Sequence, residues 1–553
     1  NTTGGANTAL GYAAGFSLNG GDYNVVIGNG AGYNLAGASE CILIGDEAGT
    51  NINSANANGT VAIGHEALKS MISYPANTAI GHQAGTAMTS NIGNTIIGYD
   101  AFKSADYFED YNVVIGHNAG AAINHANADD NVLVGYNAGY GGANALRQSV
   151  AIGSNALDAT GGYAVTGTVA IGYNALTALT SGGGNVAIGH ENSKAITTGT
   201  ENTSVGNSAN YNSTDDGNNT FVGRYAGTNV ESDENTFFGT EAGAGVQGTT
   251  VGSQNTSIGY RSMYNHTTSN KVVAVGNAAL QLLTTGNQNV HLGFRAGQYN
   301  TVGSNMVVIG NEAGRYATGS LNVFIGANAG KGGTTSAPYS SGDHNTAVGY
   351  NAFAAHTTGY QNVVIGSYTG DAITTGYNNT ALGYAALSAE DTGTRNVAIG
   401  NEALKVLNYD GAGYNVAVGH RAGYALTTGT TNTFIGAFAG GATDDGTRNV
   451  VLGYAAMDTG NAGDDNIAIG YGALQDTTAS GNIAIGSYAM TQHTTGVRNI
   501  AIGQAAMYDT DAGSTSLGST DNIFIGYNAG SGTWADAAST HNVTVGNYTM
   551  NNA

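Results

Sequence analysis

The sequence predicts an all-β fold, a single long parallel β-solenoid of the β-roll type with about 31 coils of about seventeen residues. Three observations support this prediction: a repeat of nearly constant length, a short β-branched segment in every repeat, and a glycine directly after that segment. Repeats of this size cannot bury a hydrophobic face alone and must stack on their neighbours. We therefore expect one continuous array over residues 1–553.

The repeat is defined by a glycine that follows a short apolar run, as in NVVIG ending at Gly28 and NVAIG ending at Gly189. We call these 31 residues, from Gly11 to Gly546, the landmark glycines. Of the 30 intervals between them, 17 are seventeen residues long, none is shorter than sixteen, and the longest are 23. A minimum length with occasional additions indicates a fixed coil with loop insertions, the largest near 331–344 and 508–521. Seventeen residues cannot hold the two helices of a helical repeat.

Each coil is predicted to have one strand directly before its landmark glycine. Numbering columns from that glycine, all 31 repeats have Val, Thr or Ile at −3, and all have an apolar residue at −1. Residues two apart share one face of a strand, and β-branched residues favour extended backbone, so we expect this pair to form the core. The −2 column should then face outward.

The −2 column is nevertheless apolar in 27 of 31 repeats. Its largest members are Phe237, Phe324, Phe434 and Phe524. An outward apolar stripe of this length exceeds what monomers expose, which favours coverage by another chain of a homo-oligomer. The alternative is that a second sheet of the same chain covers it.

The −4 column carries asparagine in 25 of 31 repeats. Identical amides on successive coils can hydrogen-bond along the stacking direction, as in cross-β structures. The sequence thus predicts a structural asparagine ladder that includes Asn7, Asn24, Asn77, Asn94, Asn185, Asn396 and Asn482. Cys41 occupies one slot of this column, and we expect it to be a buried substitute rather than a nucleophile.

The composition argues against several classes of function. The net charge is −22 with no basic run, which argues against nucleic acid as a partner. The sequence contains neither an apolar stretch long enough to span a bilayer nor a recognisable catalytic, cofactor-binding or complete metal-ligand pattern. We therefore expect no catalytic residues, no cofactor and no metal, and a protein that is not an enzyme.

Two weaker candidates for ligand binding lie in the +1 column. Tyrosine occupies this column in ten repeats, and Tyr454, Tyr471 and Tyr527 could stack on sugars of a host-surface or glycan receptor. The alternative is that these rings pack over the coil corner. His65 and His82 lie in adjacent coils and could share a metal, but a solvent-facing role is favoured because further ligands are missing from their column.

At the level of the repeat, the chain resembles two related groups of proteins. NTAIG followed by HQAG (Asn77 to Gly85) and TTGYNNTALGYAAL (Thr374 to Leu387) resemble the seventeen-residue repeats of bacterial and viral tail-fibre-domain proteins. NVAIG (Asn185 to Gly189) is similar to the head repeats of trimeric autotransporter adhesins, whose coils are shorter. The resemblance implies a left-handed roll and a homotrimer. No capping domain is visible at either end, so we expect further repeats, another domain or a head-to-tail neighbour there.

These observations favour a non-enzymatic extracellular fibre, located on a cell surface or a virion. It would be an adhesin head or shaft, or the shaft of a virion tail fibre, that gives rigid reach and attachment to a surface receptor. One alternative is an extracellular filament formed by self-stacking of the coils. The other is an ice-binding solenoid, which would need a flat and evenly spaced threonine array.

Overall fold

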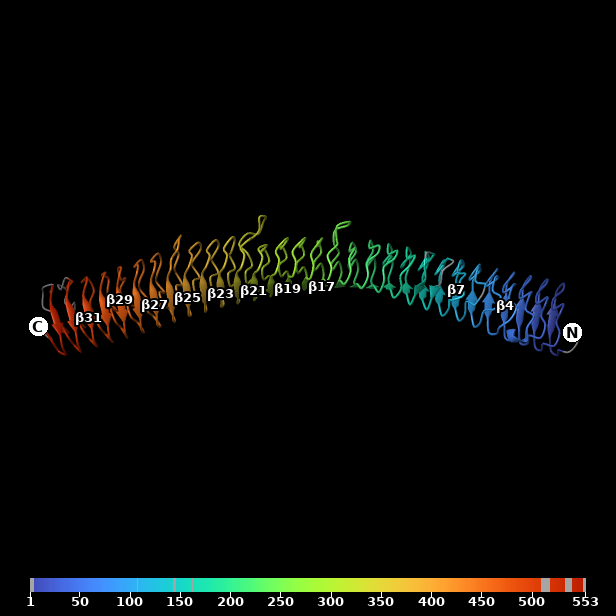
Figure 1. Cartoon of the computed structure of the whole chain (residues 1–553), viewed down its shortest axis with the longest axis horizontal. Coiled ribbons are helices and arrows are strands. Elements are labelled where there is room, and N and C mark those ends of the chain that lie inside the picture. The colour runs from blue at the N-terminus through green and yellow to red at the C-terminus, as the bar shows by residue number, and fades with distance from the viewer. Residues whose placement is uncertain are drawn as a thin grey trace. The chain divides into compact units, whose positions relative to one another are not determined.

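The computed structural model describes residues 4–106, 108–142, 146–161, 163–508, 518–532 and 540–550. It confirms an all-β parallel solenoid in which successive coils are about seventeen residues apart. The chain divides into two compact units, Asn1–Val272 and Val273–Ala553. In each unit every coil contributes one short arrow to a row of parallel strands (Figure 1).

The first unit contains one main ladder and two minor elements. The main ladder consists of β1 (Thr8–Leu10), β2 (Val25–Ile27), β3 (Ile42–Ile44), β4 (Val61–Ile63), β5 (Thr78–Ile80), β6 (Thr95–Ile97), β7 (Val113–Ile115), β8 (Val132–Val134), β10 (Val150–Ile152), β12 (Val169–Ile171), β13 (Val186–Ile188), β14 (Thr203–Val205), β15 (Thr220–Val222), β16 (Thr236–Phe238) and β17 (Thr256–Ile258). A small second sheet pairs β9 (Leu146–Arg147) with β11 (Val165–Thr166), and η1 (Ala55–Ala57) is a single 3₁₀ turn.

The second unit repeats the same architecture. Its ladder consists of β18 (Val273–Val275), β19 (Val290–Leu292), β20 (Val307–Ile309), β21 (Val323–Ile325), β22 (Thr346–Val348), β23 (Val363–Ile365), β24 (Thr380–Leu382), β25 (Val397–Ile399), β26 (Val416–Val418), β27 (Thr433–Ile435), β28 (Val450–Leu452), β29 (Ile467–Ile469), β30 (Ile483–Ile485), β31 (Ile500–Ile502), β32 (Ile523–Ile525) and β33 (Val543–Val545).

The strands pair in parallel and in strict register, so every column of the repeat becomes a row of equivalent side chains. Thr78 of β5 lies opposite Thr95 of β6, and Ile80 lies opposite Ile97. The same register holds in the second unit, where Val397 of β25 lies opposite Val416 of β26. Because neighbouring parallel strands lie about 4.8 Å apart, equivalent residues of adjacent coils are direct neighbours.

The landmark glycines form the corner that ends each strand. Gly28 has a φ of 139°, which L side chains rarely adopt. A Cβ built on Gly28 would lie 2.2 Å from the carbonyl oxygen of Gly45 in the next coil. Both the backbone conformation and the close approach of the next coil therefore require glycine at this corner.

The predicted facing of the strands is wrong. Phe237, Phe324, Phe434 and Phe524 of the −2 column are fully buried inside the coils rather than exposed. The −3 and −1 residues flank them on the outer face of the ladder. The narrow coil interior explains this arrangement, because it holds one column per strand, and the commonest residue of that column is alanine, for example Ala62.

The core of each coil contains three further columns beside the −2 column, and one of them, the +4 column, includes fully buried large side chains such as Leu68 and Phe102. The +3 column is formed by fully buried small residues such as Ala67 and Ala84. The −10 column supplies larger side chains from the far side of the coil, such as Ile373 and Leu426. Small residues of the +3 column and larger ones of the other core columns together fill the interior at the close packing typical of protein cores.

The insertion at 331–344 lies in the connection between β21 and β22, and its Ser340 forms a parallel bridge with Ala317 of the preceding β20–β21 connection. Loops of the β16–β17 and β21–β22 connections project beyond the row of coils (Figure 1). Most of the second predicted insertion, near 508–521, lies outside the described residues.

Candidate functional site

The largest candidate site is an apolar surface along the outer face of each ladder. We call the −3 and −1 side chains of the strands the outer ridge. Ile80, Ile97 and Ile152 expose 36%, 37% and 37% of their surface, and Phe238 exposes 55%. The pattern repeats from coil to coil because the register is strict. An outward apolar surface therefore exists in each unit, but its residues differ from the phenylalanines expected from the sequence.

The asparagines of the −4 column are mostly buried within the solenoid and lie directly before the strands. The backbone N–H of Asn24 donates to Oδ1 of Asn7, 2.8 Å away, and Nδ2 of Asn24 donates to the carbonyl oxygen of Ala38, 2.9 Å away. Asn94 bonds Asn77 in the same way at 3.0 Å. Each amide thus joins the strand of one coil to a turn of the next, and this satisfies buried backbone groups.

The same bonding recurs in both units, and the remaining predicted members take part in it. Nδ2 of Asn185 donates to the carbonyl oxygen of Gly199 at 2.8 Å, and the backbone N–H of Asn482 donates to Oδ1 of Asn466 at 2.9 Å. Asn396 accepts from Asn415 at 3.3 Å, while its own Nδ2 has no partner among the described residues. Cys41 is buried in its slot, and burial raises the pKa of its thiol. A buried thiol of this kind is a poor nucleophile.

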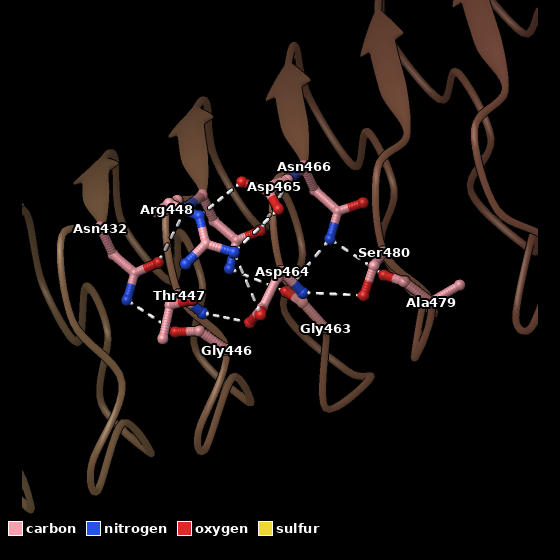
Figure 2. Close-up of polar contacts among 11 residues, drawn as sticks. Asn432, Gly446, Thr447, Arg448, Gly463, Asp464, Asp465, Asn466, Ala479 and Ser480 are labelled. Atoms are coloured by element: carbon pink, nitrogen blue, oxygen red, sulfur yellow. Dashed lines mark hydrogen bonds and ion pairs between the residues drawn. The ribbon is translucent and has the colours of Figure 1, made fainter.

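Charged residues also join adjacent coils beside this ladder (Figure 2). Nε of Arg448 donates to Oδ1 of Asp465 at 2.6 Å, and Nη2 donates to Oδ2 of the same residue at 2.9 Å. Asp464 accepts from the backbone N–H of Thr447 at 2.9 Å. These contacts are exposed ion pairs and hydrogen bonds at turns, and they link adjacent coils, which is a structural role.

The +1 aromatic residues stack on one another along the first unit. The ring centroids of His65 and His82 lie 5.0 Å apart, those of His82 and Tyr99 lie 4.6 Å apart, and those of Tyr99 and His117 lie 5.0 Å apart. The planes of these pairs are within 13° of parallel. The inner rings, His82 and Tyr99, therefore have a neighbouring ring stacked on each face, although Tyr99 still exposes 49% of its surface.

The tyrosines singled out from the sequence follow the same rule in the second unit. Tyr454 and Tyr471 stack at 5.5 Å with an angle of 9°, and the edge of Tyr488 contacts Tyr471 at 5.0 Å. Tyr527 contacts Tyr548 edge to face at 5.1 Å. Sugars bind aromatic residues through a free ring face. The stacking of Tyr454 and Tyr471 therefore favours packing over sugar binding for this pair.

Several buried ionisable residues were not anticipated from the sequence. His291 takes a −2 position, is fully buried, and both of its ring nitrogens are without partners among the described residues. Burial lowers its pKa to about 3. Glu390 takes a −10 position, and burial raises its pKa to about 7. The signal was present in the alignment of the repeats, because both residues replace aliphatic side chains of core columns.

Within the described residues, no group of three or more His, Cys, Asp or Glu side chains could hold a metal ion. Nor does that part of the chain contain a helix with the length and hydrophobicity needed to cross a membrane.

Comparison with protein-family models and with curated protein sequences finds no match for this chain. The geometry of its own residues therefore carries the functional argument.

Proposed function

We propose that this chain is a segment of a non-enzymatic extracellular fibre, an adhesin head or shaft or the shaft of a virion tail fibre. In this proposal the chains associate as a homotrimer through their outer ridges, and the fibre provides rigid reach and attachment to a surface. The number three and the left-handed sense rest on the resemblance to adhesin head repeats.

The exposed outer ridge is the observation that carries this proposal. Each coil presents an apolar −1 residue and a Val, Ile or Thr at −3, and equivalent residues lie directly next to one another along the ladder. Monomeric proteins rarely expose contiguous apolar patches larger than roughly 300–600 Å². A second copy of the chain has the same spacing between its coils. It could bury this surface by placing each of its coils against one coil of the first copy.

The bonding between coils supports a mechanical role. Within each unit, most coils are joined to the next by strand pairs, asparagine bonds and corner contacts, as at Asn432, Asn449 and Asn466. Stacked repeats of this kind derive their stability from nearest-neighbour interfaces. The repetition of one set of contacts suits a stiff spacer better than a catalyst.

Sedimentation and light scattering of the full chain test the assembly. We expect a particle of three chain masses, and the double substitution Ile80→Glu with Ile97→Glu should shift it toward the monomer. The matched control, Thr86→Glu with Ser104→Glu, adds the same charge in the same coils but away from the strands, and should leave the trimer intact. A wild-type chain that is monomeric at micromolar concentration would reject the homotrimer.

A second candidate, an ice-binding solenoid, is favoured by one specific observation. Thr203, Thr220, Thr236 and Thr256 occupy the −3 column of four successive strands, and each lies opposite the next in register. They form a short, evenly spaced row on the outer face. Thermal hysteresis of the purified chain, reduced by Thr220→Leu, would support this candidate, and its absence would dismiss it.

A further inference from the structure

The +5 column of the first unit has a small residue, Ala244, between larger residues of the two adjacent coils. Lys194 and Tyr211 are successive members, and Nζ of Lys194 lies 5.5 Å from the centre of the Tyr211 ring. Thr228 and Tyr264 continue the row, but the coil between them has Ala244 at this position. Because equivalent positions of adjacent coils lie about 4.8 Å apart, one missing side chain leaves a slot two coil spacings wide.

A cavity of about 250 Å³ occupies this slot. It is lined by two aromatic residues, Tyr225 and Tyr264, by three polar residues, Thr228, Asn229 and Glu241, and by Ala244 and Gly245. Pockets that enclose drug-sized ligands measure about 300–1,000 Å³. A volume just below that range suits a single ring rather than a longer ligand.

The lining side chains are already held in place. The guanidinium group of Arg224 lies 4.5 Å from the centre of the Tyr225 ring, and that of Arg261 lies 5.2 Å from the centre of the Tyr264 ring. Nε of Arg261 also donates to Oε2 of Glu241 at 2.6 Å. Groups that are fixed before binding lose little conformational entropy when a ligand arrives.

The polar groups indicate what kind of ring would fit. Tyrosine rings can pack against the C–H faces of a sugar, while carboxylate and hydroxyl oxygens accept hydrogen bonds from its hydroxyl groups. Glu241 lines the cavity, and a carboxylate oxygen can accept more than one hydrogen bond, so Glu241 can act as such an acceptor. Neither Arg224 nor Arg261 is among the residues that line the cavity, whereas the carboxylate residue Glu241 is, so the slot does not favour an anionic group.

We propose that this slot binds one pyranose ring of a neutral saccharide. The inference rests on the attachment role proposed above and gives it a ligand class. Unlike the stacked +1 tyrosines, Tyr225 and Tyr264 line an open cavity rather than a continuous stack.

The test is saturation-transfer NMR on the full chain with methyl glycosides of glucose, galactose, mannose and N-acetylglucosamine. We expect at least one glycoside to bind with millimolar affinity. Ala244→Tyr restores the missing member of the row, as Tyr264 shows that the column accepts tyrosine, and should weaken binding by about tenfold or more. Tyr264→Ala should weaken it similarly.

Ala354→Tyr is the matched control, because it makes the same change at the same coil position in the second unit. Its binding should equal that of the wild type. Absence of transfer to every glycoside, or binding that is unchanged in Ala244→Tyr, would overturn the inference. Measuring the oligomeric state on the same samples separates this result from the fibre proposal: a monomer that binds the glycoside contradicts only the assembly.

Discussion

Single ionisable side chains occupy positions that the repeat normally gives to aliphatic ones. Glu390 belongs to the same core column as Ile373, and His291 lies opposite Val308 in the strand ladder. Oε1 of Glu390 accepts from the backbone N–H of Gly393 at 2.6 Å, whereas Oε2 has no partner among the described residues. Burying a charge without full pairing is costly, so each side chain favours its neutral form in the folded protein.

The stability of the wild-type protein should fall as the pH rises toward neutral, and Glu390→Gln should abolish most of this fall. The carboxyl group titrates near 4.5 when unfolded and near 7 when folded, so the free energy of unfolding falls as the pH rises between these values. The loss amounts to about 3 kcal/mol. Urea denaturation at pH 5 and pH 8 should show this difference for the wild type and a smaller one for the variant.

Glu402→Gln is the control for that experiment. Lys405 and Arg421 lower the pKa of the Glu402 carboxyl group, so its ionised form stabilises the fold. Its replacement should therefore lower stability at pH 8, the opposite sign to Glu390→Gln. Equal pH profiles for the wild type and Glu390→Gln would contradict the assignment of the buried carboxyl group.

His291→Val should stabilise the second unit, and more so in acid. The imidazole titrates near 6.5 when unfolded and near 3 when folded, so the free energy of unfolding falls as the pH drops through this range. Removing two unpartnered buried nitrogens should contribute roughly 1–3 kcal/mol at pH 7. Urea midpoints measured at pH 7 and pH 4 check this, and identical midpoints at pH 4 would argue against it.

The sequence predicts the strands and the glycine corners correctly, but it does not predict which face of each strand points into the core. The period, the three-residue strand and the glycine corner follow from residues such as Val186, Ile188 and Gly189. Alternation assigns −3 and −1 to one face and −2 to the other, but does not say which face is inside. Threonine at −3 in repeats such as that of Thr203 was the available signal, because a half-exposed column tolerates hydroxyl groups more readily than a core column.

The candidate site was predictable to a smaller extent. The asparagine column is visible as a letter pattern, since Asn24 and Asn94 recur at one position of the repeat. The slot beside Ala244 is not, because it depends on which columns lie next to one another in three dimensions. The stacking of Tyr454 on Tyr471 likewise depends on side-chain rotamers and not on spacing alone.

Phe237 and Phe238 offer a direct test of the facing. Phe237 is fully buried, and Phe237→Ala should cost roughly 3–5 kcal/mol, seen as faster amide hydrogen exchange in β15–β17. Phe238 is 55% exposed, and Phe238→Ala should leave exchange in the monomer nearly unchanged. The reverse ranking would mean that the strand faces the other way.

The corner can be tested in the same manner. A Cβ at Gly189 would lie 2.2 Å from the carbonyl oxygen of Gly206, and its φ is 143°. Gly189→Ala should therefore cost about 3 kcal/mol or more and disrupt the neighbouring coils. Gly161→Ala would bring the new Cβ no closer than 3.8 Å to the carbonyl oxygen of Ala159 and should be tolerated, as measured by urea denaturation and hydrogen exchange.

At the scale of the whole molecule, the proposed assembly would set apolar attraction between chains against a net charge of −22 on each. The outer ridge is made of apolar and β-branched side chains, as at Ile97 and Ile152. Acidic residues lie elsewhere on the coils, for example at Asp464 and Asp465. Association should therefore be limited by long-range repulsion and driven by burial of the ridge.

Salt should strengthen the proposed assembly. The Debye length falls from about 30 Å at 0.01 M salt to about 8 Å at 0.15 M, which screens repulsion between like-charged chains but leaves apolar contacts intact. The dissociation constant measured by sedimentation should fall over this range. A dissociation constant that rises with salt would show that ion pairs, rather than the ridge, hold the chains together.

The strict register of the ladder has a consequence for how such a gene can change. Removing the seventeen codons for residues 186–202 would place Thr203 directly after Asn185, so that Asn185 takes over the position of Asn202 and β14 would pair with β12. Every type of contact would be kept. Unequal recombination could thus add or remove whole coils without creating a new kind of interface between coils. The number of repeats, which is inherited, would then set the length of the ladder.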